Sequence, residues 1–152
     1  MSLLSKIQVE LKAPKNQFNS FGKYKYRSLE DIFEGLKPLL DKYECSITVS
    51  DTIVMVGDRY YVNATATLRD KNGSVIATND GWAREEENKK GMDSSQVTGA
   101  TSSYARKYAM NGLFAIDDVK DADSTNTHGK DKQVVKSLAT GTKTTVSDDD
   151  WN

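Results

Sequence analysis

Two adjacent cations late in the chain, Arg106 and Lys107, are the side chains whose chemistry stands out first. At helical spacing they share a face with glycine and small hydroxyl side chains, Gly99, Ser102 and Ser103. Small side chains let a phosphate backbone approach closely, and the two cations then neutralise its charge. The same pattern is typical of an ordinary amphipathic helix with solvated cations, so the sequence leaves both interpretations open.

Residues 91–116 are predicted to form a single helix that carries this face. Asp93 or Ser94 is placed to cap its N terminus, because either side-chain oxygen can accept from the first free backbone N–H groups. Gly112 is placed where a helix can end in a left-handed turn. The other face is a stripe of small and aromatic residues at helical spacing: Val97, Ala100, Thr101, Tyr104, Ala105 and Tyr108.

A second cluster alternates cations with aromatic rings without a break: Lys23, Tyr24, Lys25, Tyr26 and Arg27. Such interleaving suits single-stranded nucleic acid, because cations follow the phosphates while rings stack on bases. The alternative is an edge strand whose tyrosine rings enter the core while the lysine heads stay in water. The sequence does not decide between the two.

Residue patterns typical of enzymes are mostly missing. Residues 141–144 (GTKT) lack the earlier glycine and the Gly-Lys pair of a phosphate-binding loop. The three carboxylates Glu85–Glu87 do not converge from one strand, although with Asp80 or Asp93 they leave a metal-dependent nuclease as a weak alternative. His128 is the single histidine, and its place in the polar C-terminal part favours a solvated side chain. Cys45 is the single cysteine and favours a packing role. We therefore expect no enzyme, no catalytic residues, no metal site and no cofactor.

The elements that would position these clusters begin with two helices. Residues 2–12 predict a short one. The second begins at Ser28, which opens a capping-box pattern with Asp31 in place of the usual Glu. Pro38 interrupts its apolar periodicity and is predicted to kink or divide this helix.

The middle of the chain has the two-residue period of strands, in Ser46–Val56, Tyr60–Arg69 and Ser74–Arg84. Turn signals at residues 57–58 and 70–73 connect these runs as hairpins. The predicted fold is therefore α+β, a three-stranded antiparallel meander followed by the long helix (a β-β-β-α core) and preceded by two helices. A lone meander exposes one face, so helices must cover it.

Charge and composition divide the chain into two predicted parts. Residues 1–118 are expected to form the folded domain, and residues 119–152 a disordered acidic tail without sustained periodicity. Residues 1–116 hold 16 basic and 14 acidic side chains, whereas residues 117–152 hold 5 and 8. No apolar run is long enough to span a bilayer, and a single cysteine suits a reducing cytoplasm.

Four segments within about residues 2–118 carry a family resemblance: Tyr24–Leu29 with Ile32, Leu36–Leu40, Ser95–Met110 and Leu113–Asp118. Together they resemble the Erf (essential recombination function) family of phage single-strand annealing proteins. Family members usually have two arginines where this chain has Arg106 and Lys107. The change keeps both charges but gives up one planar, bidentate phosphate contact.

The resemblance implies a β-β-β-α core, assembly into rings or filaments, and annealing of complementary single-stranded DNA without ATP in phage recombination. The implied location is the host cytoplasm, in association with the nucleoid. Arg106 and Lys107, helped by Ser102 and Ser103, would hold the DNA backbone, and the Lys23–Arg27 cluster would add a second contact. Two alternatives remain open: a single-strand-binding accessory protein that coats DNA without pairing it, and an oligomeric adaptor that contacts only proteins.

The chain closes on an acidic patch with an aromatic residue, Asp148, Asp149, Asp150 and Trp151, before Asn152. This ending loosely resembles the acidic tip through which bacterial single-strand-binding proteins recruit partners, but those typically end in Pro-Phe. A contact with a host or phage replication or recombination protein is one interpretation, and a solubilising tail end is the simpler one.

Overall fold

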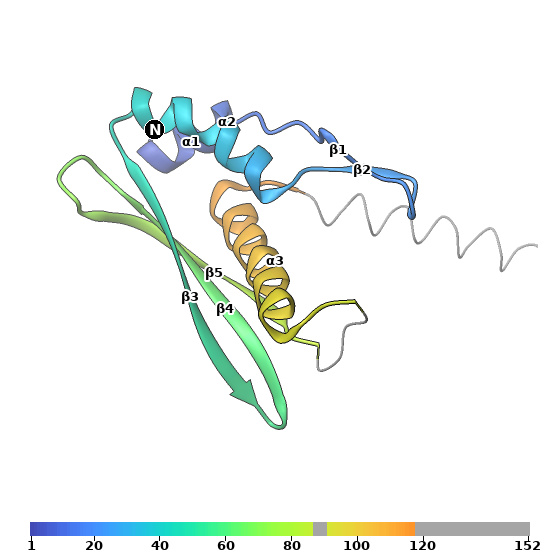
Figure 1. Ribbon diagram of the computed structural model, residues 1–152. Helices are drawn as coiled ribbons and strands as arrows, with labels where there is room; N and C mark the ends of the chain where they lie inside the picture. The colour runs from blue at the N-terminus through green and yellow to red at the C-terminus, as the bar shows by residue number, and fades with distance from the viewer. Residues whose placement is uncertain (87–90, 118–152) are drawn as a thin grey trace, which may run out of the picture. The chain divides into compact units, whose positions relative to one another are not determined.

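The computed structural model describes residues 1–86 and 91–117, and Met1–Ile116 form one compact unit. The order of elements confirms the predicted α+β fold, with two helices before a meander and one long helix after it (Figure 1). A short hairpin between the first two helices adds two strands. The elements are α1 (Leu3–Glu10), β1 (Gln17–Asn19), β2 (Tyr24–Tyr26), α2 (Leu29–Lys42), β3 (Ser46–Val56), β4 (Arg59–Arg69), β5 (Val75–Arg84) and α3 (Ser94–Phe114).

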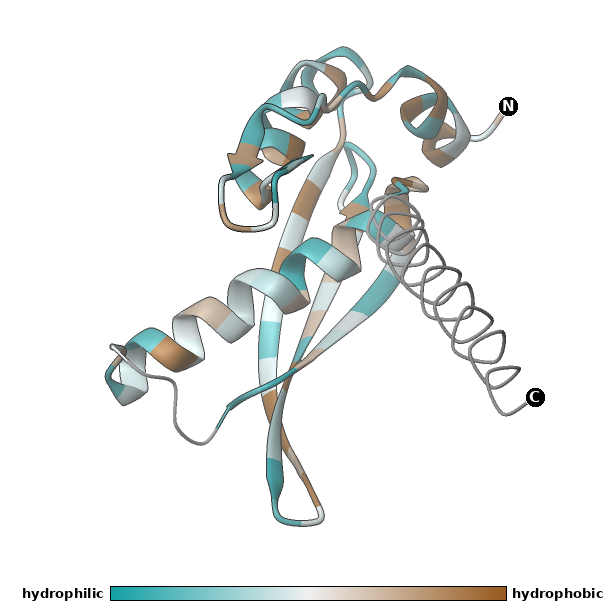
Figure 2. Cartoon of the chain, turned by 90° about the vertical axis from the view of Figure 1, so that its right-hand side faces the viewer, coloured by the Kyte–Doolittle hydropathy of each residue, from teal (hydrophilic) through white to brown (hydrophobic). Residues whose placement is uncertain are grey.

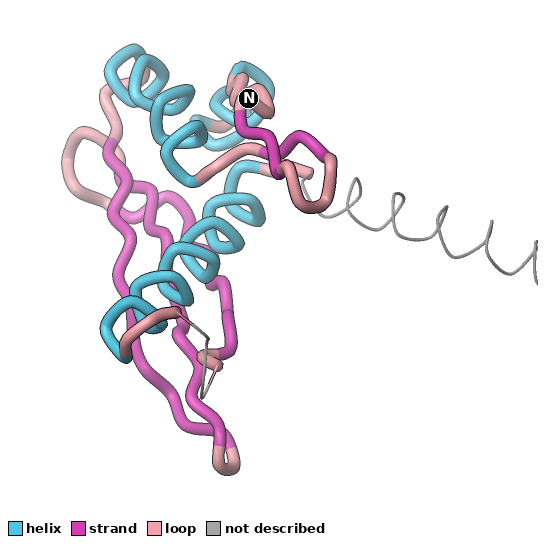
Figure 3. The backbone as a smooth tube through the Cα atoms, turned by 45° about the vertical axis from the view of Figure 1, so that its right-hand side comes forward, coloured by secondary structure: helices cyan, strands magenta, loops and turns pink. Residues whose placement is uncertain are grey.

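The meander is an antiparallel sheet in the order β3-β4-β5, in which β3 and β4 pair from Ser46↔Arg69 to Val56↔Arg59. Gly57 takes a φ of 63° in the tight turn that joins them, a conformation that glycine adopts without steric cost. Apolar and polar residues alternate along these strands (Figure 2). The β3–β4 hairpin extends beyond the N-terminal end of α3 (Figures 1 and 3).

Helix α3 packs against one face of the sheet, over β4 and β5. Alternation along β4 brings four apolar side chains to that face, and all are buried: Val62, Ala64, Ala66 and Leu68. Gly81 of β5 lies directly under the helix, where an added Cβ would come 2.3 Å from Ala105 O and Ala109 N. Small residues at this crossing therefore let the helix and the sheet backbone approach closely.

The core continues at the C-terminal end of α3, where α1 and α2 lie (Figure 1). Ile7 of α1 and Ile32 and Leu36 of α2 are fully buried in the same cluster as Met110 and Phe114 of α3. Burial of side chains of this size stabilises a fold by about 1.5–3 kcal/mol each. The two early helices are thus held by the second half of α3.

Helix α2 begins as the sequence predicts and continues through Pro38. Ser28 is the N-cap, and its hydroxyl and the Asp31 carboxylate accept reciprocal backbone hydrogen bonds in a capping box. Pro38 lies inside the helix, which runs unbroken from Leu29 to Lys42. Of the predicted kink or division at Pro38, the division is therefore wrong; the exposed proline leaves the buried face formed by Ile32 and Leu36 intact.

Of the two cap residues proposed for α3, the structure selects Asp93, whose side chain accepts from the Gln96 backbone N–H. The predicted end at Gly112 is wrong, because the helix continues to Phe114 and ends at Ala115 with a φ of 56°. Glycine has a packing role at position 112 instead: a Cβ there would come 2.2 Å from Nδ2 of Asn79. That amide donates to Ala109 O at 3.0 Å and ties β5 to α3.

The stripe predicted along α3 divides into two parts. Val97, Thr101 and Ala105 are buried against the sheet, as packing requires. Tyr104 and Tyr108 instead keep 54% and 43% of their surface exposed. The helix sits so close to β5 at Gly81 that these large rings have no room beneath it, and they lie along its flank.

A polar network joins α1 to α2. Glu10 accepts hydrogen bonds from the Tyr43 hydroxyl and from Lys42 Nζ, the latter at 3.0 Å, while Lys42 and Lys6 lie over the Tyr43 ring. The hydrogen bond from Tyr43, followed by that from Lys42, lowers the pKa of Glu10 below its ordinary value of 4.5. The charged carboxylate is thus the form that the folded state favours.

Replacing Glu10 with glutamine is expected to lower the midpoint of thermal unfolding at pH 7, because the amide keeps an acceptor but loses the charge. A depressed folded-state pKa gives stability that is present above pH 4.5 and is lost as pH falls through the lowered value. The difference between wild type and Glu10→Gln should therefore vanish in strong acid. Glu34→Gln, at an exposed carboxylate on α2, is the matched control; an equal effect of both variants would contradict the network's role.

Candidate functional site

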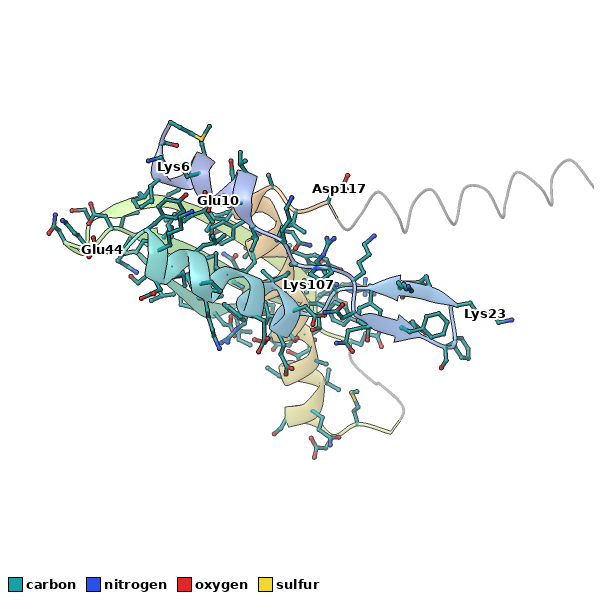
Figure 4. All side chains as sticks on the ribbon, turned by 90° about the horizontal axis from the view of Figure 1, so that it is seen from above. Lys6, Glu10, Lys23, Glu44, Lys107 and Asp117 are labelled. Carbon is teal, nitrogen blue, oxygen red and sulfur yellow. The ribbon has the colours of Figure 1, made fainter. Side chains whose placement is uncertain are left out.

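The hairpin β1–β2 carries the cluster that alternates cations with rings. Gln17 pairs with Tyr26 and Asn19 with Tyr24, and Lys23 lies at the far end of the hairpin, which projects from the body (Figure 4). Lys23 and Lys25 are exposed. At the base, the Arg27 Nε–H donates to the Ala13 carbonyl at 2.7 Å, so this cation helps to hold the hairpin to the chain before it.

The tyrosines of the hairpin do not enter the core. Tyr24 is 44% exposed and Tyr26 is half-buried, with ring centroids 6.1 Å apart. Asn19 Nδ2 donates to the Tyr24 hydroxyl at 3.1 Å and orients that ring. Of the two interpretations that the sequence left open, a strand with tyrosines in the core is therefore wrong, and the rings remain accessible.

The two predicted clusters meet where Lys107 lies over the ring of Tyr26. Lys107 Nζ lies 5.5 Å from the centroid of the Tyr26 ring, a distance suited to a cation–π interaction. Figure 4 shows Lys107 of α3 near the base of the hairpin. The pKa of Asp31 is lowered, chiefly by the Ser28 backbone N–H, and the charge of Lys107 adds to that lowering. The late helix and the early hairpin thus share one surface.

Arg106, by contrast, is turned towards the sheet. Its Nε and Nη2 donate to both oxygens of Asp51 on β3 at 3.0–3.2 Å, and the Ser102 hydroxyl donates to the same carboxylate. Burial alone would raise the pKa of Asp51, but the hydrogen bonds from Arg106 and Ser102 and the arginine charge lower it overall. Asp51 therefore remains ionised and compensates the charge of Arg106.

The neighbouring cations are both half-buried and differ in the groups that they contact, Asp51 for Arg106 and the Tyr26 ring for Lys107. Ser103, one turn before Lys107, is exposed, whereas Ser102 is half-buried beside Asp51. A guanidinium has five N–H donors, so Arg106 keeps donors beyond those that Asp51 occupies, but the pair is neutral as a unit.

Asp51 was not predicted from the sequence as part of the site. A single carboxylate in a strand of alternating residues carries no signal, because its partner lies on a helix 55 residues later. The exposed rings of Tyr104 and Tyr108 were assigned to a stripe without regard to exposure. The sequence did contain one signal, the small residue Ala105 between two large ones. A helix that packs closely on a sheet through small residues leaves no space beneath it for tyrosine rings.

Chemistry that would point to catalysis is sparse in the part of the chain that the structure describes. Within residues 1–86 and 91–117, no three His, Cys, Asp or Glu side chains are grouped so as to hold a metal ion. Burial raises the pKa of the Cys45 thiol, so the less reactive protonated form is favoured. The helices in these ranges are too short or too polar to cross a bilayer.

The fold and the surface together define an α+β protein with a β-β-β-α unit, whose last helix joins an early hairpin in a surface of cations and exposed rings. The profile of the ERF superfamily matches residues 2–147, and the chain belongs to this superfamily, as its resemblance to the Erf family predicts.

One relative is the Essential recombination function protein of Salmonella phage P22, which is 68% identical over 121 residues. That alignment covers 80% of this chain, and the chain spans 57% of the relative's length. No solved structure matches the chain. The predicted partner-binding residues Asp148, Asp149, Asp150 and Trp151 lie outside the described residues.

Proposed function

We propose that this protein binds single-stranded DNA and anneals complementary strands without ATP, as an oligomer, in phage-type homologous recombination. The observation that carries the proposal is the contact between Lys107 and Tyr26, which brings a phosphate-binding cation and a base-stacking ring into one surface. Membership of the ERF superfamily and the name of the phage P22 relative support the recombination role.

The physical requirement of annealing is that two polyanions approach while their bases stay free to test pairing. In the proposed arrangement Lys107 and Ser103 of α3, with Lys23 and Lys25 of the hairpin, hold the sugar-phosphate chain. Tyr24 and Tyr26 offer ring faces to bases, each stacking contact being worth about 1–3 kcal/mol. Arg106 and Ser102 act at the edge of this surface, where Asp51 moderates the charge.

Oligomerisation follows from the small number of phosphates that one copy can hold. A few contacts give weak, salt-sensitive binding, since log affinity falls by about 0.7 per phosphate for each tenfold rise in salt. Several copies on one strand multiply these contacts without any new chemistry. No bond in DNA is made or broken, so the proposal includes no catalytic residue and no cofactor.

The proposal is tested by mixing two complementary, dye-labelled strands with the protein and following their pairing by energy transfer. An annealing protein accelerates pairing with or without ATP and magnesium, and the rate depends on protein concentration. A protein that only coats DNA slows pairing, which would favour the accessory-protein alternative. Cleavage that requires magnesium would favour the nuclease, and the absence of a gel shift at low salt would favour the protein-only adaptor.

A further inference from the structure

A hollow of about 360 Å³ lies between the end of β5 and the flank of α3, on a part of the surface that the sequence does not predict as a site. Its lining includes Trp82 and Arg84 from β5 and Tyr104 and Tyr108 from α3. Tyr104 and Tyr108 keep 54% and 43% of their surface exposed, whereas Trp82 follows Gly81 on β5, so strand alternation directs its ring to the other face of the sheet. The hollow is thus an accessible aromatic surface and not a gap in the core.

The two tyrosines form a continuous shelf along the helix. Their ring centroids are 6.3 Å apart and their planes differ by 32°, so the rings offer neighbouring faces to one ligand. Elsewhere α3 meets the sheet through small residues such as Ala105, over Gly81. The two rings on this flank leave about half of their surface uncovered, and clustered exposed apolar surface is typical of a binding site.

The shelf adjoins the proposed DNA surface. Lys107 follows Tyr104 by three residues and precedes Tyr108 by one, and residues three apart are neighbours on a helix surface. The same Lys107 lies over Tyr26 of the hairpin. The Tyr104–Tyr108 shelf, Lys107 and Tyr26 therefore make a track of rings interrupted by a cation, running along α3 to the hairpin.

Resting on the function proposed above, we infer that this hollow holds an unstacked base of the bound single strand, whose adjoining phosphate is held by Lys107. A volume of about 360 Å³ is at the small end of ligand pockets and suits a group the size of a base. Arg84 and Glu86 also line the hollow, and their opposite charges offset each other. One base held by each copy fixes the strand against sliding and leaves the intervening bases exposed for pairing.

The test replaces both rings, as Tyr104→Leu with Tyr108→Leu, and keeps all charges. We expect affinity for an oligo-dT strand to fall about fivefold to a hundredfold, the range for lost base stacking, with an unchanged salt slope because no phosphate contact is lost. Tyr60→Leu, at a ring of 52% exposure on β4 outside the hollow, is the matched control and should bind normally.

An abasic strand of the same length separates base binding from other roles of the rings. Wild type should bind it more weakly than oligo-dT, and the double variant should bind the two strands with nearly equal affinity. A double variant that binds oligo-dT as wild type does, or that loses the same factor on both strands, overturns the inference. So does a smaller assembly in sedimentation, because a second copy of the chain would then occupy the hollow.

The two proposals fail separately. Wild type that binds neither strand, or that binds oligo-dT without accelerating pairing, contradicts the proposed function. Wild type that accelerates pairing but binds the abasic strand as tightly as oligo-dT contradicts only a base in the hollow.

Discussion

Replacing Gly81 with alanine is expected to lower the free energy of unfolding by about 1–3 kcal/mol, the usual cost of overpacking, or more. An added Cβ would come 2.3 Å from Ala105 O and Ala109 N and 2.9 Å from Tyr108 C. All three atoms belong to the helix backbone, so no side chain can rotate away, and α3 must shift from β5. Urea unfolding followed by circular dichroism measures the change.

Gly99→Ala is the matched control in the same helix. Nothing lies within 4 Å of a Cβ at Gly99, and alanine in a helix interior is favoured over glycine by about 0.5–1 kcal/mol. This variant should therefore be slightly more stable than wild type. A Gly81→Ala protein with wild-type stability would mean that α3 does not cross β5 as closely as described.

Sequence periodicity was sufficient to predict the frame of the site. The alternation of Val62, Ala64, Ala66 and Leu68 gave β4 its buried face, and polar residues at Ser28 and Asp93 marked the starts of α2 and α3. These features depend on neighbours in the chain, through strand pleat and helix capping. Local rules were therefore enough for the β-β-β-α order.

Features that depend on distant residues were missed. Gly112 has the sequence signature of a helix end, yet its role is to admit the side chain of Asn79 from β5. Tyr104 and Tyr108 fit a buried periodicity, but the closeness of the helix to Gly81 excludes them. The compensation of Arg106 by Asp51 requires the sheet register and the helix position together. Each miss is a tertiary contact that no local pattern encodes.

The second prediction is that substitutions at Arg106 and at Lys107 change the salt dependence of DNA binding by different amounts. Lys107→Ala is expected to reduce the salt slope of single-strand affinity by about 0.7 per protomer, the loss of one phosphate contact. Its stability cost should stay within about 0.5–1 kcal/mol, from the lost contact with Tyr26. Fluorescence anisotropy with oligo-dT at several salt concentrations measures the slope.

Arg106→Ala is expected to change the salt slope less than Lys107→Ala does. Arg106 donates to Asp51, so its removal takes away a contact within the protein and leaves the charge of Asp51 uncompensated. Stability should fall by about 0.2–1 kcal/mol, as for other partly exposed ion pairs, because Asp51 loses the partner that joins β3 to α3. A double variant, Arg106→Ala with Lys107→Ala, that keeps both the wild-type affinity and the salt slope would remove α3 from the proposed DNA surface.

Asp51→Asn separates charge compensation from hydrogen bonding at the same position. Asparagine keeps a side-chain oxygen for Arg106 and Ser102 but removes the negative charge, so the full charge of Arg106 becomes available to phosphate. Affinity for oligo-dT should rise, most at low salt, and the salt slope should steepen by up to about 0.7. Combining Asp51→Asn with Arg106→Ala should abolish that gain, because the released cation is then absent. A gain that persists in the combined variant would show that Asp51 repels DNA directly, and Arg106 would then have a structural role alone.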